Sequence, residues 1–172
     1  LWLEQCRVML SRLPGDRVGV IGHSLSGSLA LRLAALEPRV HRVMTTATMG
    51  ARFAANAVTR ATWDCPADRA GLEAAARRLI ADERLIDAAY LDHRAAQLFQ
   101  GDYRAYYGTM FEGDRQRFID AAALSPAELA AIRAEVLMLH GKDDLGYPAE
   151  ALSLALARAI PQADVMLLAQ CS

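Results

Sequence analysis

Val18-Gly19-Val20-Ile21-Gly22-His23-Ser24-Leu25-Ser26-Gly27 is the most informative stretch of the sequence. Its first four residues, 18–21, form a short apolar run that is typical of a strand covered on both faces. After the turn at 22–27, residues 29–36 have the apolar spacing of a helix, and a run rich in β-branched residues follows at 40–46. Strand, helix and strand in this order predict a βαβ unit, and therefore a parallel sheet.

The same alternation returns near the end of the sequence. We expect a buried strand at 136–139, a helix begun by proline at 148–159 and a last strand at 165–168. A further helix is predicted at 1–13. The sequence therefore predicts an α/β fold built on a parallel sheet of about four strands.

Residues 53–133 lie between these two parts and contain no convincing strand. Helical segments follow one another there, at 68–81, 83–99, 103–111 and 115–123. Ser125-Pro126-Ala127-Glu128 is typical of a helix start, with a serine cap, a proline in the first turn and a glutamate placed to complete a capping box. We interpret 1–52 and 134–172 as parts of one sheet-containing core, and 53–133 as a helical cap inserted into it.

The composition excludes several classes of protein. The 172 residues are 53% hydrophobic and carry a formal net charge of −1, which provides no overall field to attract nucleic acid or an anionic membrane. No apolar run approaches the roughly 18 residues of a membrane-spanning helix, and no signal-peptide pattern is present. Cys6, Cys65 and Cys171 are far apart and fit neither a disulfide framework nor a zinc site. We therefore expect a cytoplasmic protein that uses no metal and no other cofactor.

Ser24 lies where the first predicted strand turns into a helix, and this position suits a nucleophile. A serine on such a sharp, strained turn exposes its hydroxyl above the sheet, at the N-terminus of the helix. The small residues Gly22 and Ser26 let the strand and the helix approach each other. The backbone N–H of Leu25 would then donate a hydrogen bond to an oxyanion. The alternative is an ordinary serine that caps the helix.

A nucleophilic serine of this kind needs an acid and a base, in the chain order serine, aspartate, histidine. His140-Gly141-Lys142-Asp143-Asp144 follows the predicted strand at 136–139, which is where the acid is expected. Either aspartate fits, and we favour Asp144 because it lies at the far end of the loop. We expect Asp143 to make hydrogen bonds within the turn or at a helix cap.

None of the four histidines fits the role of the base. We expect His23 to pack under the turn, His41 to begin a strand on its outer side, His93 to lie in the helical cap and His140 to support the acid loop. In this architecture the base belongs in the loop after the last strand, where the sequence ends at Ser172. The expectation is that both ends of the sequence are cut and that the base lies beyond Ser172.

Further stretches of the chain combine with the turn around Ser24 into a recognisable set. These are Gly22–Gly27, Met49-Gly50, Trp63–Arg94, Met110-Phe111, Arg115-Gln116-Arg117 and His140–Asp144. Together they resemble the α/β-hydrolases, and more narrowly the meta-cleavage product hydrolases, which break carbon–carbon bonds during the degradation of aromatic compounds. The likeness covers nearly the whole chain. It implies four more strands and a second oxyanion donor before Leu1, and a histidine directly after Cys171-Ser172.

The resemblance also implies roles for individual residues. Ser24 would be the nucleophile and Asp144 the acid. Arg94 would match the cap arginine that binds the carboxylate of the substrate, which suits a bidentate guanidinium. The alternative for Arg94 is a surface ion pair with a nearby acid such as Asp92. Trp63 resembles a residue at the entry of the cap, with simple packing as its alternative.

The function that the resemblance implies is that of a serine-type hydrolase cleaving a carbon–carbon bond in a small-molecule product of aromatic ring cleavage. A carboxylesterase or lactonase of the same fold is the alternative, and homo-oligomerisation is left open. His23 and Thr45-Thr46-Ala47-Thr48 depart from the family pattern beside the acyl pocket, so the particular substrate is also left open. A third hypothesis is that the 172-residue chain by itself is inactive, because it lacks the base and one oxyanion donor.

Overall fold

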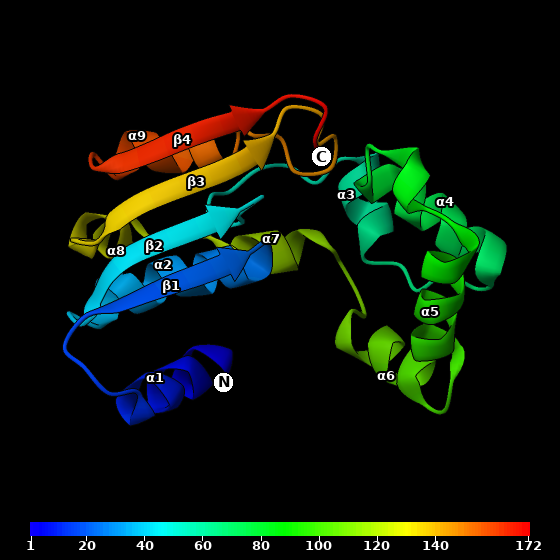
Figure 1. The fold of residues 1–172 in the computed structure, drawn as a ribbon, viewed down its shortest axis with the longest axis horizontal. Coiled ribbons are helices and arrows are strands. Elements are labelled where there is room, and N and C mark those ends of the chain that lie inside the picture. Colours follow the sequence, from blue (N-terminus) through cyan, green and yellow to red (C-terminus); the bar gives the residue numbers. More distant parts are fainter.

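The computed structural model describes residues 1–172, and its centre is a four-stranded sheet (Figure 1). All three neighbouring pairs of strands are parallel, and the strand order along the sheet follows the order in the sequence. The predicted α/β fold with a parallel sheet is therefore confirmed. The strands are β1 (Val18–His23), β2 (Val40–Thr46), β3 (Glu135–Gly141) and β4 (Ala163–Leu168).

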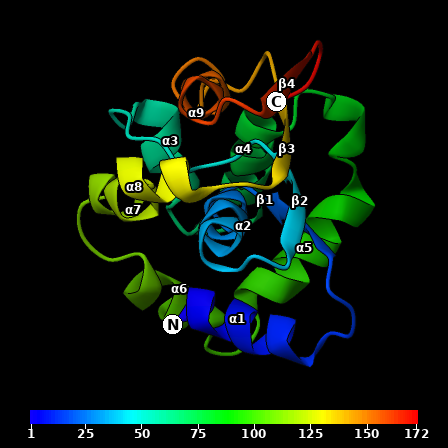
Figure 2. The same ribbon diagram turned by 90° about the vertical axis from the view of Figure 1, so that its left-hand side faces the viewer.

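Two helices, α2 (Leu25–Leu36) and α9 (Ser153–Ala159), lie against one face of this sheet, as Figure 2 shows. Helix α8 (Pro126–Ala131) packs on both of them, and α1 (Trp2–Arg12) packs against α2. The apolar residues between the helices and the sheet form the main core, in which Leu31, Met138 and Ile160 are completely buried. This burial is the main source of stability for the sheet and its helices.

The opposite face of the sheet carries exposed apolar side chains. Ile21 is 75% exposed, and Met166 and Leu137 are also exposed. A hollow of about 580 Å³ lies on this face over β1, β2 and β3. Burial alternates along β3 because the helices pack against the other face of the sheet only. The expectation that residues 18–21 are covered on both faces is therefore wrong for this chain.

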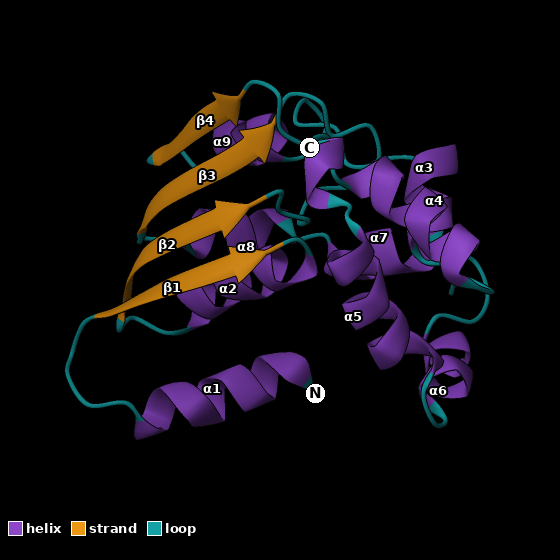
Figure 3. Ribbon diagram, turned by 45° about the vertical axis from the view of Figure 1, so that its right-hand side comes forward, coloured by secondary structure: helices purple, strands orange, loops and turns teal.

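The remaining helices lie beyond the carboxyl ends of the strands, as Figures 1 and 3 show. They have a small core of their own, built from Leu72, Ala76, Ile86 and Leu91. We call this group the helical part: α3 (Ala57–Thr62), α4 (Arg69–Leu79), a 3-10 turn (Glu83–Leu85), α5 (Ala88–Phe99) and α6 (Tyr103–Met110). The chain then returns to the sheet through α7 (Gln116–Ala122).

The side-chain amide of Gln116 joins the two chain segments that connect the helical part to the sheet. Its Oε1 accepts a hydrogen bond from the backbone N–H of Ala55 at 2.9 Å. Its Nε2 donates one to the carbonyl oxygen of Phe53, also at 2.9 Å. The segment that leaves β2 is thereby tied to the first turn of α7.

Helix ends account for most differences between the predicted and the observed elements. The capping box predicted at Ser125 and Glu128 is confirmed. Helix α3 was not predicted, and it begins at Asn56, which forms a capping box with Thr59. The predicted helix at 83–99 is broken because the Asp87 side chain accepts the N–H of Tyr90 and starts α5 there. Helix α9 begins at Ser153 rather than at residue 148.

Candidate active site

Ser24 lies at the sharp turn between β1 and α2, and its backbone is strained. Its φ of 53° and ψ of −122° lie in a region that non-glycine residues seldom adopt. Three hydrogen bonds hold it there: its N–H donates to Thr46 at 2.9 Å, and its carbonyl oxygen accepts from Gly27 at 2.9 Å and from Met49 at 3.0 Å. The predicted strained turn is thus present, and it is fastened to the end of β2 on one side and to the start of α2 on the other.

Two glycines make this turn sterically feasible. A Cβ at Gly22 would overlap the carbonyl oxygen of Ser26, and a Cβ at Gly27 would overlap the hydroxyl of Thr48. Ser26 contributes its backbone to this contact, and its own side chain is exposed. The close approach of strand and helix expected at Gly22 and Ser26 is therefore present, and the structure adds a second one between Gly27 and Thr48.

The backbone N–H of Leu25 is available at the same turn. Leu25 is the first residue of α2, so its N–H has no acceptor within the helix. The helix has 12 residues, and the partial positive charge of its N-terminus lies at this end. An oxyanion that formed on an acyl group bound to Ser24 would meet both this donor and the helix dipole.

Asp144 is the better-held carboxylate of the acid loop. Its side chain is 11% exposed, and its Oδ1 accepts the backbone N–H of Tyr147 at 2.8 Å. Asp143 is exposed, and its carboxylate forms neither a hydrogen bond nor an ion pair with the chain; only its backbone N–H is bound, to Cys171 at 2.9 Å. The turn-forming hydrogen bond expected of the Asp143 side chain is therefore made by Asp144 instead.

The four histidines are engaged elsewhere or lie away from the turn. His23 is exposed and its Nδ1 lies 2.8 Å from the Thr46 hydroxyl, so it does not pack under the turn as predicted. His41 is in β2, and His93 on α5 contacts Gln97 at 3.2 Å. His140 is buried and both of its ring nitrogens have partners. No histidine bridges the Ser24 and Asp144 side chains by a hydrogen bond.

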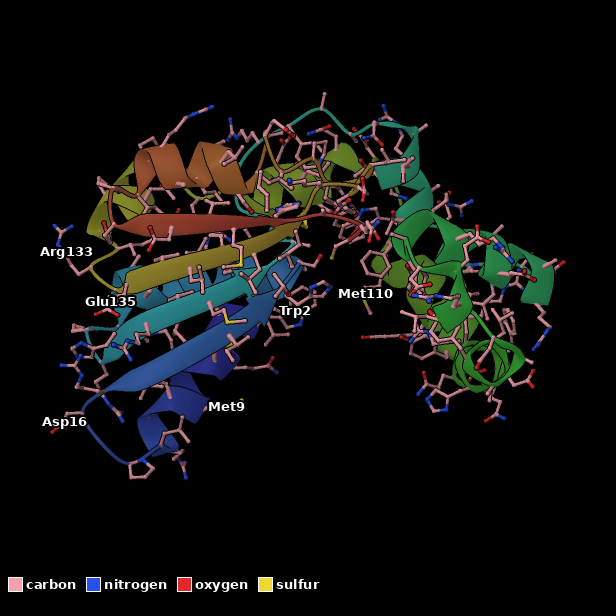
Figure 4. All side chains as sticks on the ribbon, turned by 45° about the horizontal axis from the view of Figure 1, so that its top comes forward. Trp2, Met9, Asp16, Met110, Arg133 and Glu135 are labelled. Carbon is pink, nitrogen blue, oxygen red and sulfur yellow. The ribbon has the colours of Figure 1, made fainter.

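An aromatic cavity of about 210 Å³ opens beside Leu25. Trp63 lines it and stacks on Phe118, with ring centroids 5.1 Å apart and planes at 11°, while Phe111 meets the Trp63 ring edge-on at 5.0 Å. Trp2 of α1 and Met110 of α6 line the same cavity, and Figure 4 shows these two residues on the facing sides of the sheet core and the helical part. Trp63 and Leu25 thus line the same cavity.

Arg94 is exposed on α5 and does not line this cavity. It forms no ion pair, and Asp92 is paired with Arg69. The alternative of an Arg94–Asp92 ion pair is therefore wrong, and the guanidinium of Arg94 is unpaired.

Tyr147 closes the acid loop from the inside. The side chain is buried and its ring meets Phe53 edge-on, with centroids 6.1 Å apart. Burial raises the pKa of Tyr147 to about 12, because the phenolate would lose its hydration. The phenol is therefore neutral at physiological pH.

The described residues contain no group of three or more histidine, cysteine, aspartate or glutamate side chains arranged to hold a metal ion. All three cysteines are free. None of the helices has both the length and the apolar character needed to cross a membrane.

The family of the chain follows from a comparison with models of known protein families. Residues 2–172 match the model of the alpha/beta hydrolase family. The chain belongs to this family. Within it, the chain is 28% identical over 171 residues to 2-hydroxymuconate semialdehyde hydrolase from Pseudomonas putida. The matched region covers 99% of this chain and 60% of that relative. It is also 28% identical to 2-hydroxy-6-oxo-2,4-heptadienoate hydrolase from Pseudomonas putida F1, with coverages of 99% and 62%.

Solved structures of alpha/beta hydrolases show the same fold. A meta-cleavage product hydrolase from Pseudomonas fluorescens IP01 superposes with a TM-score of 0.90 at 24% identity, over 99% of this chain and 62% of that one. The naproxen esterase of Bacillus subtilis superposes with a TM-score of 0.72 at 16% identity, over 99% and 58%. The resemblance to meta-cleavage product hydrolases is confirmed, and the chain spans about three fifths of the length of these relatives.

Proposed function

We propose that the complete protein is a serine hydrolase that cleaves a carbon–carbon bond in a product of aromatic ring cleavage. The observation that carries this proposal is the strained backbone of Ser24 between β1 and α2. A strand-to-helix turn of this kind costs on the order of 1–3 kcal/mol of backbone strain. Such strain is typical of active sites, because it holds a nucleophile in the open position above a sheet.

Ser24, Leu25 and Asp144 would supply three of the functions that acyl chemistry needs. The Ser24 hydroxyl would add to the substrate carbonyl, or activate a water that does so. The Leu25 N–H would donate to the resulting oxyanion. Asp144, held by Tyr147, would orient and stabilise a protonated histidine base. We expect this histidine outside residues 1–172, because the four present here are engaged or lie away from the turn.

The chemical class of the substrate is proposed from the relatives, whose names give hydroxymuconate semialdehyde and a hydroxy-oxo-heptadienoate. Such a molecule has a dienoate at one end and a ketone or aldehyde at the other. The dienoate would take up a proton at carbon, the carbonyl would gain the hydroxyl of water, and the bond between them would break. The products are a carboxylic acid and a 2-hydroxydienoate, so that one water is consumed.

Two regions of the chain would bind the two ends of the substrate. Trp63 and its aromatic neighbours form an apolar wall next to Leu25, which suits the uncharged part. The unpaired guanidinium of Arg94 would bind the carboxylate in a bidentate manner. Because Arg94 is exposed on α5, this binding requires the substrate to lie between α5 and the turn.

The test is the complete protein mixed with a coloured ring-cleavage product, followed by the loss of visible absorbance. We expect the colour to disappear with the wild type and to persist with Ser24→Ala. Ser26→Ala, two residues away and exposed, is the matched control and should retain activity. Unchanged colour together with rapid hydrolysis of simple esters would contradict carbon–carbon cleavage and identify a carboxylesterase or lactonase.

We also propose that residues 1–172 alone show no serine-dependent turnover. Without a histidine base, a serine nucleophile loses several orders of magnitude in rate. A fluorophosphonate probe tests this directly, since it labels only activated serines. Labelling of Ser24 in the 172-residue chain at the rate found for the complete protein would contradict the proposal.

A further inference from the structure

His140 is a buried polar residue at the carboxyl end of β3, and it contacts two other segments. Its side chain is 1% exposed. Its Nδ1 lies 2.6 Å from the hydroxyl of Ser153, the first residue of α9. Its Nε2 lies 2.7 Å from the carbonyl oxygen of Tyr147. The imidazole therefore fills the space between the strand, the acid loop and the helix that follows the loop.

The partners determine which nitrogen of a neutral His140 ring carries the hydrogen. The Tyr147 carbonyl oxygen can only accept, so Nε2 must carry a hydrogen and donate it. A neutral ring then has a lone pair on Nδ1, which accepts the hydrogen of the Ser153 hydroxyl. The charged group near the ring is Asp144, whose Oδ2 lies 3.7 Å from Nε2, beyond hydrogen-bonding distance.

Tyr147 connects His140 to Asp144. Its carbonyl oxygen accepts from His140, and its N–H donates to Oδ1 of Asp144 at 2.8 Å. The backbone of this one residue is thus held at both ends, and its ring is buried. The direction of the Asp144 carboxylate depends on where the Tyr147 N–H lies, and this in turn depends on His140.

We propose that His140 is a positioning residue that sets the orientation of Asp144 through the backbone of Tyr147. Oδ1 is occupied by the Tyr147 N–H, and Oδ2 makes no hydrogen bond within the chain. Oδ2 is therefore free to receive the N–H of a catalytic histidine. This inference rests on the proposed role of Asp144 as the acid, and it assigns His140 no contact with the substrate.

The test is a double-mutant cycle in the complete protein, with the hydrolysis rate and the melting temperature both measured. We expect Asp144→Asn to lower kcat by roughly 10³–10⁴-fold, and His140→Leu to lower it about 10- to 100-fold with little change in KM. Because both substitutions act on the Asp144 carboxylate, His140→Leu should lower kcat little further when Asp144→Asn is already present. A purely structural role would lower the rate by the same factor in both backgrounds and would overturn the proposal.

A matched pair of variants keeps the test decisive if His140→Leu does not fold. His140→Gln places an amide N–H where Nε2 lies and keeps the bond to Tyr147, whereas His140→Asn reaches only the Ser153 side. We expect His140→Gln to have a higher kcat than His140→Asn. We expect Ser153→Ala to retain nearly all of the wild-type kcat. Equal rates for the two His140 variants, or a higher rate for His140→Asn, would contradict the inference.

The failure of this inference is distinguishable from that of the proposed function. Full activity of Asp144→Asn would refute Asp144 as the acid, and the proposal for His140 would fall with it. An inactive Asp144→Asn combined with unchanged kcat in every His140 variant would leave the proposed function intact. That second result would refute only the role of His140.

Discussion

Gly141 lies directly against the carbonyl oxygen of Cys171, so closely that a Cβ at residue 141 would overlap it. Two strands and a loop meet at this point. The Asp143 N–H donates to the same Cys171 oxygen, and the Lys142 N–H donates to Leu168. The start of the acid loop is therefore built onto the segment that follows β4, and the contact tolerates no side chain.

Gly141→Ala is expected to destabilise the protein by about 1–3 kcal/mol, because the added methyl forces backbone to move against backbone. Chemical denaturation with and without the substitution measures the effect. Gly108→Ala is the control, since nothing lies within 4 Å of a Cβ there and Gly108 is in the middle of α6. It should be neutral or stabilise by roughly 0.5–1 kcal/mol. Equal stability of both variants would show that the overlap at residue 141 is relieved at no cost.

Asp143→Asn and Asp144→Asn form a second matched pair in one loop. Asp143 is exposed and its carboxylate has no partner, so its substitution should change kcat little. Asp144 is the carboxylate held by the Tyr147 N–H, and its substitution should abolish most of the activity. The hydrolysis rate of the complete protein decides between them. The opposite order of effects would assign the acid to Asp143.

Arg94→Gln is expected to raise KM about tenfold or more while kcat changes little, because a binding contact is lost without damage to the nucleophile. Arg84→Gln is the control, since Arg84 is exposed in the same part of the chain and paired with Asp82. Steady-state kinetics on the complete protein measure both. Another arginine, Arg78, lines a cavity of about 290 Å³ together with Asp143 and Ser172. If Arg78→Gln raised KM and Arg94→Gln did not, the substrate carboxylate would bind at Arg78 and the role proposed for Arg94 would be wrong.

Tyr147 should make stability depend on pH in the alkaline range. Burial raises its folded pKa from 10.0 to about 12, so the folded state keeps the proton where the unfolded state loses it. This contribution is fully present below pH 10 and is lost as the pH rises towards 12, with a total of roughly 2–3 kcal/mol. The free energy of unfolding, measured from pH 8 to 12, should fall more steeply with pH for the wild type than for Tyr147→Phe. Parallel curves would contradict the raised pKa.

The sheet and the turn at Ser24 were predictable because their signals are local. The runs at 18–21 and 136–139 are short and apolar, the run at 40–46 is rich in β-branched residues, and helical patterns follow them in the sequence. The order of these elements is enough to make the strands parallel. Whether one face of the sheet or both are buried was not predictable, because an apolar run such as 18–21 is compatible with either arrangement.

Other features depend on contacts between distant segments, and no local pattern reports them. The packing of Gly27 against Thr48 joins the turn to the loop after β2, although the glycine itself was visible in the motif. His23 was expected under the turn, but its bond to Thr46 on the neighbouring strand keeps it exposed. Helix α3 differs from these features, because the capping box of Asn56 and Thr59 is a local signal for its start.

The bridge that Gln116 makes to Phe53 and Ala55 has a consequence for how the two parts of the molecule move. The side-chain amide makes the two hydrogen bonds that a peptide group would make. The segment that leaves β2 and the segment that returns at α7 are therefore held together as one connection, here called the stem. A displacement of α3–α6 that spreads this stem must break both hydrogen bonds, whereas a swing about the stem breaks neither. Other bonds resist such a swing, because the Thr59 hydroxyl of α3 donates to the carbonyl oxygen of Gly146 and the Ser172 hydroxyl donates to that of Leu79 at the end of α4. The helical part is therefore anchored to the sheet core at three separate places, and any rotation of it as a unit must release at least two of them.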